Sequence, residues 1–219
     1  ARSGGALFLV DAAQTAGHLP LNMAALPVDL VACPGHKGLL GPLGTGLLCL
    51  RAGIEERLQP VRQGGTGSHS EDIQQPRSLP DRYESGNHNA PGLFGLEAAL
   101  EWLSGQGVKQ VAAREQELTA RLLDGLSSLR NIRIAGPADA EQQVAVVSIS
   151  AIGFEPQELA SILDESFEIE TRAGLHCAPG AHRAAGTFDK GGTVRLSCGP
   201  FTTEQQIEAV IAALADITD

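Results

Sequence analysis

One lysine, Lys37, lies in a glycine-rich loop directly after a short apolar run, in the sequence VACPGHKGLLGPLGTG (residues 31–46). Partial burial makes a lysine amine less basic, and such an amine can form a Schiff base with an aldehyde. Asp11 ends an earlier apolar run. A carboxylate at the end of a buried strand can hold a pyridine nitrogen protonated. An amine and a carboxylate of this kind are the minimum protein equipment for pyridoxal phosphate (PLP).

An isolated loop lysine is most often simply solvated, and the neighbours of Lys37 argue against that interpretation here. Gln14 follows Asp11 by three residues, and His36 directly precedes the lysine. The glycines of the loop allow the backbone to approach a ligand closely. The sequence therefore favours a ligand site built from these two segments.

A second glycine-rich segment, AGLHCAPGAH (residues 173–182), contains Cys177. Arg172, His176 and His182 flank this cysteine, and nearby positive charge or imidazole favours the nucleophilic thiolate. Two other interpretations stay open. A lone cysteine is more often a small buried hydrophobe, and the two histidines with the cysteine can be read as a metal site. Their spacing matches no common zinc pattern, so we expect no metal.

The composition limits the possible partners. The chain has 219 residues, 42% of them hydrophobic, and a formal net charge of −10, which repels nucleic acid and anionic membranes. No apolar run approaches the roughly 18 residues of a membrane span, and the first residues lack a signal-peptide pattern. The four cysteines include no C-x-x-C pair, so neither a disulfide framework nor a zinc ribbon is indicated. We expect a cytoplasmic protein that binds neither nucleic acid nor membranes.

The elements before residue 90 predict part of an α/β sheet. Short apolar runs at residues 6–10, 28–33 and 46–50 indicate buried strands. The polar stretch from residue 61 to 89 predicts a long functional loop. Sheets of this kind usually contain more than three strands. We therefore expect the chain to be the C-terminal portion of a longer protein.

The elements after residue 90 predict two helices and then a small α+β domain. Helical spacing appears in residues 91–103 and 108–126. Further strands are expected at residues 132–135, 144–149 and 193–197, and further helices at residues 156–163 and 204–217. Thr202 or Thr203 can cap the last helix, with a glutamine three residues later.

Five ordered blocks of the sequence resemble the class V aminotransferases of fold-type I, most closely their cysteine desulfurase and selenocysteine lyase branch. The blocks are VDAAQ…GHK (10–37), GGTGSHS (64–70), YESGNHNAPGLFGLEAALEWL (83–103), TRAGLHCAPGAH (171–182) and GTVRLSCGPFTT (192–203). The resemblance implies an α/β fold with two parts. Residues 1–90 would be the C-terminal part of the large PLP-binding domain, with a mixed, mostly parallel sheet. Residues 91–219 would be connecting helices and a small α+β domain.

The resemblance also implies a role for each matched residue of the cofactor site. Lys37 matches the lysine that bonds PLP covalently and moves the Cα proton of the substrate. Asp11 matches the partner of the ring nitrogen, Gln14 the donor to the phenolic oxygen, and His36 a phosphate ligand. Thr66 matches a residue that reaches the phosphate of the neighbouring subunit, so a homodimer is implied.

On the substrate side, Arg195 matches the arginine that binds the substrate α-carboxylate, and Arg172 matches a second anion contact. A planar guanidinium fits a carboxylate with two hydrogen bonds, which a lysine cannot do. Cys177 matches the cysteine that forms a persulfide. One position departs from the family: Pro34 stands where Ser or Thr is common, and it can donate neither a hydroxyl nor an N–H to phosphate.

The implied function is conversion of L-cysteine to L-alanine, with the sulfur held on Cys177 as a persulfide and passed to a possible acceptor protein. A selenocysteine lyase acting on L-selenocysteine and a class V aminotransferase are alternatives within the same fold. The chain can also be an inactive fragment or a scaffold that lacks the family's N-terminal half.

Overall fold

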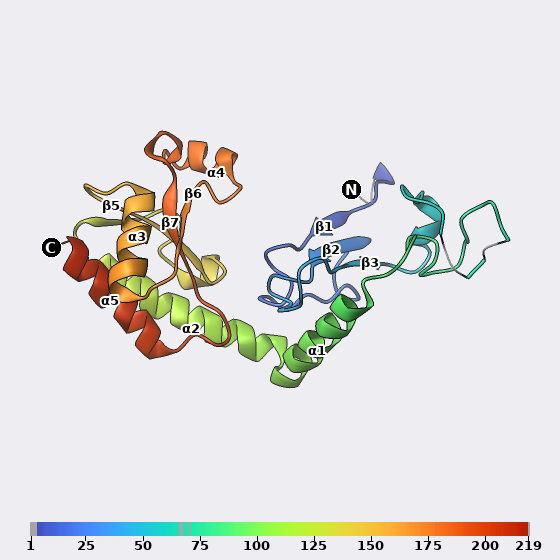
Figure 1. Cartoon of the computed structure of the whole chain (residues 1–219), viewed down its shortest axis with the longest axis horizontal. Helices are drawn as coiled ribbons and strands as arrows, with labels where there is room; N and C mark the ends of the chain where they lie inside the picture. Colours follow the sequence, from blue (N-terminus) through green and yellow to red (C-terminus); the bar gives the residue numbers. More distant parts are fainter. Residues whose placement is uncertain (1–3, 66–67, 70, 219) are drawn as a thin grey trace. The chain divides into compact units, whose positions relative to one another are not determined.

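The computed structural model describes residues 4–65, 68–69 and 71–218 (Figure 1). The chain separates into two compact units, Ala1–Val108 and Lys109–Asp219, which are described separately below. The division falls one helix later than the boundary after residue 90 expected from the sequence. The expected domain boundary after residue 90 therefore stays a prediction.

The first unit contains a three-stranded sheet in the order β1-β2-β3, visible in Figure 1. Its strands are β1 (Leu9–Asp11), β2 (Leu30–Pro34) and β3 (Gly46–Leu50). The first two strands run parallel, with Asp11 opposite Ala32, and the third runs antiparallel to β2. The sheet is therefore mixed, as expected.

The expectation that all three strands are buried is wrong for β1 and β3. Leu30 and Val31 of the central strand are each 4% exposed, whereas Leu9 and Leu48 of the outer strands are each 51% exposed. A central strand has a neighbour on both sides, and the described residues cover this one well. The outer strands keep their apolar side chains at the surface.

A short 3₁₀ helix, η2 (Ile54–Arg57), leads into the long loop, and α1 (Ala90–Gln106) follows it. The described residues between η2 and α1 form neither strand nor helix, which confirms the predicted loop. Hydrogen bonds fix part of it: the Tyr83 hydroxyl donates to the Glu55 carbonyl at 2.9 Å. The helix then begins behind Asn89, whose side chain accepts from the N–H of Gly92 at 3.2 Å.

The second unit is an α+β structure, which confirms the expectation. Its sheet has the order β4-β5-β7-β6, and every neighbouring pair is antiparallel. In chain order, the elements from residue 108 are α2 (Val108–Ser127), β4 (Ile132–Ile134), η3 (Ala140–Gln142), β5 (Val146–Ala151), α3 (Pro156–Phe167), β6 (Arg172–Gly174), α4 (Pro179–Ala184), η4 (Phe188–Lys190), β7 (Thr193–Ser197) and α5 (Glu204–Thr218). The sequence pattern indicates neither β6 nor α4.

One face of this sheet packs against helices α2, α3 and α5, which form a continuous apolar core with it. Val194 and Leu196 of β7 point into this core, being 0% and 6% exposed. Because side chains alternate along a strand, Arg195 between them lies on the opposite face. Behind β7, Thr203 and Gln206 form the reciprocal capping box that begins α5, at 2.9 and 3.2 Å.

Candidate active site

In the first unit, the predicted cofactor residues follow two neighbouring parallel strands. Since β1 and β2 run in the same direction, their carboxyl ends lie at one edge of the sheet, where ligands of α/β proteins bind. Asp11 closes β1, and its Oδ1 accepts a hydrogen bond from the N–H of Ala13 at 2.9 Å. A tight turn after β2 carries His36 and Lys37, both exposed. The structure thus brings these residues to one edge of the sheet.

Direct contact between two backbones joins the segments that carry these residues. A Cβ atom at Gly17 would lie 1.9 Å from the carbonyl oxygen of Gly38, and one at Gly38 would lie 2.4 Å from that of Ala16. No side chain fits at either position. The ring of His18 also lies against Gly38, where an added Cβ would meet its Cδ2 at 2.5 Å. His18 therefore lies beside the lysine turn, although its position in the sequence gave no sign of this.

The loop after Lys37 folds back on itself and is supported by α1. The N–H of Gly35 donates to the Thr45 carbonyl at 2.8 Å, and the N–H of Gly41 donates to the Gly35 carbonyl at 2.7 Å. Leu96 of α1, only 2% exposed, packs against both glycines, where an added Cβ would meet its Cδ1 at 3.2 and 2.7 Å. Two backbone hydrogen bonds and a buried leucine of α1 therefore support the loop that carries the lysine.

These residues fit the chemistry that PLP requires. Lys37 offers a primary amine, Asp11 a carboxylate, His36 an imidazole and Gln14 an amide, all on the two segments joined at Gly17 and Gly38. Thr66, the predicted contact to a neighbouring subunit's phosphate, lies outside the described residues.

In the second unit, two arginines lie directly opposite each other on neighbouring strands. Arg172 of β6 pairs with Arg195 of β7, and Ser148 of β5 lies opposite Arg195 on its other side. Like charges directly across a pair of strands are destabilising. Within the described part of the chain, the Nε of Arg195 is buried and has no hydrogen-bond partner. The pair can therefore bind an anion such as a carboxylate.

The predicted sulfur acceptor follows Arg172 closely. Cys177 is exposed, and a terminal nitrogen of the Arg172 guanidinium donates to its Sγ at 3.8 Å. The backbone is left-handed at both His176 and Cys177, with φ of +51° and +59°. This conformation costs a non-glycine residue about 1–2 kcal/mol. The strained position therefore coincides with the predicted nucleophile.

The surroundings of His176 disfavour its protonated form. Burial, followed by the charge of the neighbouring Arg195 guanidinium, lowers the pKa of His176 below its ordinary value of 6.5. His182 and Arg172 add smaller repulsive contributions, and a hydrogen bond to Thr193 opposes the shift.

The described residues contain no group of three His, Cys, Asp or Glu side chains arranged to hold a metal ion.

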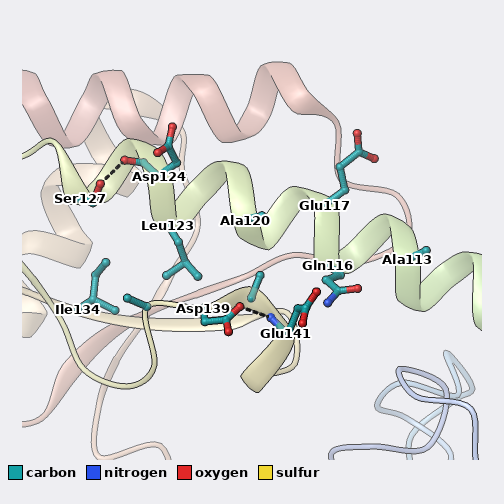
Figure 2. Close-up of a pocket in the computed structure, with 12 residues that line it drawn as sticks. Ala113, Gln116, Glu117, Ala120, Leu123, Asp124, Ser127, Ile134, Asp139 and Glu141 are labelled. Atoms are coloured by element: carbon teal, nitrogen blue, oxygen red, sulfur yellow. Dashed lines mark hydrogen bonds between the residues drawn. The ribbon is translucent and has the colours of Figure 1, made fainter.

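A groove of the second unit lies away from these residues, beside α2 (Figure 2). Its volume is about 770 Å³, and its charged lining residues are all acidic: Glu117, Asp124, Asp139 and Glu141. Such a lining repels the carboxylate of an amino acid. We therefore place the candidate substrate site at the arginines rather than in this groove.

None of the helices among the described residues is long and apolar enough to cross a membrane.

The comparisons with known proteins identify a family. The sequence pattern of the family described as Aminotransferase class-V matches residues 1–210. A probable cysteine desulfurase of Methanothermobacter thermautotrophicus is 34% identical over 215 residues, covering 97% of this chain and 53% of that protein. The apo cysteine desulfurase of Thermococcus onnurineus NA1 has a TM-score of 0.87 and 31% identity, covering 99% of this chain and 54% of its own.

A third relative is the cystine C-S lyase C-DES, which has a TM-score of 0.78 and 27% identity, covering 96% of this chain and 52% of its own. Its structure contains its reaction product, cysteine persulfide, and a variant of C-DES carries glycine covalently linked to the PLP cofactor. The chain thus spans about half the length of the relatives it matches.

The backbone contact beneath the lysine turn can be tested with Gly38→Ala. The added Cβ would lie 2.4 Å from the Ala16 carbonyl, so the turn must shift. We expect the free energy of unfolding of the first unit to fall by about 1–3 kcal/mol, measured by urea titration. Gly105→Ala is the matched control, because nothing lies within 4 Å of its added Cβ. Equal effects of the two substitutions would contradict this role.

The lowered pKa of His176 predicts a pH dependence of stability. As pH falls below about 6.5, the unfolded chain binds a proton that the folded unit does not yet bind. The free energy of unfolding should therefore decrease from pH 6.5 down to the folded pKa, and then stop changing through this group. His176→Gln should remove that part of the slope in urea titrations between about pH 8 and 5. Parallel profiles of the two proteins would refute the assignment.

Proposed function

The chain belongs to the aminotransferase class-V family, and from this premise we propose that the protein is a PLP-dependent cysteine desulfurase converting L-cysteine to L-alanine. The observation that carries the proposal is the cluster of the second unit, where an exposed thiol lies against one of two paired arginines. A transaminase needs the arginines but not the thiol. The names of the relatives, which include cysteine desulfurases, support the same choice.

The first unit supplies the cofactor half of this function. When bound, PLP stabilises negative charge at the substrate Cα by acting as an electron sink. Asp11 would keep the ring nitrogen protonated, since a carboxylate favours the charged form. Lys37 would hold the cofactor covalently and would accept the proton from the substrate Cα. His36 would contact the phosphate, and Gln14 the phenolic oxygen.

The second unit supplies the substrate half. Arg195 binds the α-carboxylate through two parallel hydrogen bonds, and Arg172 adds a second anion contact. The Cys177 thiolate attacks the substrate sulfur and forms an S–S bond. The C–S bond breaks, its electron pair stays with Cβ, and Cβ takes up the proton that the Cys177 thiol released. Lys37 returns the proton that it accepted to Cα, which gives alanine. The product on the protein is a persulfide.

The partners follow from the same proposal. The protein acts as a homodimer in the cytoplasm and passes the persulfide sulfur to an acceptor protein. The exposure of Cys177 supports such a transfer, because an acceptor thiol must reach the sulfur directly.

Cys177→Ala tests the reaction class. The variant should still bind PLP, because the cofactor residues belong to the first unit, but sulfur transfer should fail, since the nucleophile is gone. Mass spectrometry after addition of L-cysteine without reductant should find one extra sulfur on Cys177 of the wild type. Cys198→Ala is the control, because burial raises the pKa of this thiol to about 11 and makes it a poor nucleophile. A persulfide on Cys198, or full activity of Cys177→Ala, would overturn the proposal.

Lys37→Ala tests the cofactor assignment separately. Incubation with PLP followed by borohydride reduction should attach the cofactor to Lys37 in the wild type and leave the variant unmodified at this turn. Lys109→Ala and Lys190→Ala are controls, since both lysines lie in the second unit. Peptide mapping locates the adduct. Retention of a specific adduct in Lys37→Ala would move the cofactor site elsewhere.

A further inference from the structure

The turn that carries Cys177 has a backbone that its own residues disfavour. The N–H of Ala178 donates to the Leu175 carbonyl at 2.8 Å, which closes a four-residue turn. Both central residues, His176 and Cys177, have positive φ. Hairpin turns with two such positions normally use Asn and Gly. A turn built from His and Cys persists only where its surroundings hold it.

The imidazole of His176 restrains this turn by a hydrogen bond to Thr193. Its Nε2 lies 3.1 Å from both the carbonyl oxygen and the Oγ1 of Thr193. A carbonyl only accepts, so Nε2 carries the hydrogen and donates it. Thr193 is fully buried at the start of β7, where close packing restrains it. The adjacent Gly192 lies so close to the Gly174 carbonyl that an added Cβ would be 2.1 Å from it. The segment between β6 and β7 is therefore held by close contact where it leaves β6 and where it enters β7.

The same turn determines where the sulfur lies. Cys177 is the residue next to His176, and its Sγ receives the hydrogen bond from Arg172, at the start of β6. This hydrogen bond orients the sulfur and places a positive charge beside the atom that reacts. A change in the backbone at His176 therefore moves the sulfur away from the arginine.

We propose that His176 is a positioning residue: its hydrogen bond to Thr193 holds the left-handed turn that directs the Cys177 sulfur toward Arg172. This role rests on the proposed function, in which Cys177 is the sulfur acceptor. The reactivity of the Cys177 thiol can nevertheless be measured without cofactor or substrate.

Two substitutions of His176 distinguish the effect of its hydrogen bond to Thr193 from the effect of the residue's own preference against positive φ. His176→Gln keeps an N–H donor at the same reach as Nε2. His176→Asn tolerates positive φ better than histidine does, but its amide is too short to reach Thr193. The rate of alkylation of each cysteine by iodoacetamide is followed by peptide mass spectrometry at pH 7. The exposed Cys49 of the first unit serves as the internal reference.

We expect Cys177 of His176→Asn to react about fivefold more slowly relative to Cys49, as loss of one hydrogen bond implies. His176→Gln should stay within about twofold of the wild type. Arg172→Gln should slow the reaction on its own, but add little to His176→Asn, because both act through one contact. Wild-type reactivity in a folded His176→Asn, or equal losses in the Asn and Gln variants, would overturn the proposal.

Thr193→Val covers the case in which His176→Asn does not fold. It removes the Oγ1 contact from the other side and keeps the shape of a buried β-branched residue. Its Cys177 should react about twofold more slowly, and an unchanged rate would equally refute the proposal. If the protein were no desulfurase, these rates would still differ as described, and only the persulfide on Cys177 would be missing. The two failures are therefore distinguishable.

Discussion

The antiparallel pairing of β6 with β7 positions every candidate residue of the second unit. It sets Arg172 against Arg195 and brings Gly174 opposite Thr193. The first pairing concentrates positive charge on one face of the sheet, at a cost that a bound anion would remove. The second fixes the base of the turn that presents the thiol. Charge and nucleophile therefore depend on a single register of hydrogen bonds between two short strands.

In the first unit, no strand pairing of this kind holds the described candidate residues in place. Its candidate residues stand on turns that follow β1 and β2, and turns are less restrained than strands. Close approach of glycine backbones replaces the missing restraint: Gly17 rests on Gly38, and Gly35 and Gly41 rest on Leu96. Close packing at glycines thus restrains the turn that carries Lys37, whereas strand pairing restrains the arginines of the second unit.

The sequence indicates the regular elements well, because their apolar periodicity is strong. The strands at residues 46–50 and 193–197 have the observed bounds. The local pattern offers Thr202 or Thr203 as the cap of the last helix, and Thr203 is the one that forms the capping box. The sequence does not reveal β6 or α4, which are short and rich in glycine and proline. The bond between His176 and Thr193 was also beyond prediction, since it joins residues 17 positions apart through a long-range register.

The candidate residues themselves were selected by type and by resemblance, and their placement by the structure is consistent with shared sites in each unit. Their roles stay predictions, because roles depend on ligands rather than on folding. The outer strands are more exposed than their apolar composition predicts, because such composition indicates a tendency to be covered but not which residues supply the cover.

The uneven burial of the two units has a consequence for their local opening. The second unit has a continuous core beneath its sheet, whereas the first leaves Leu9 and Leu48 half exposed. Amide hydrogens in β1 and β3 should therefore exchange with solvent faster than those in β5 and β7, which pack on that core. A cofactor held only by the folded first unit stabilises it by mass action. Saturation with PLP would then slow exchange in β1 to β3 and leave β5 and β7 unchanged, which makes deuterium uptake a report on which unit holds the cofactor.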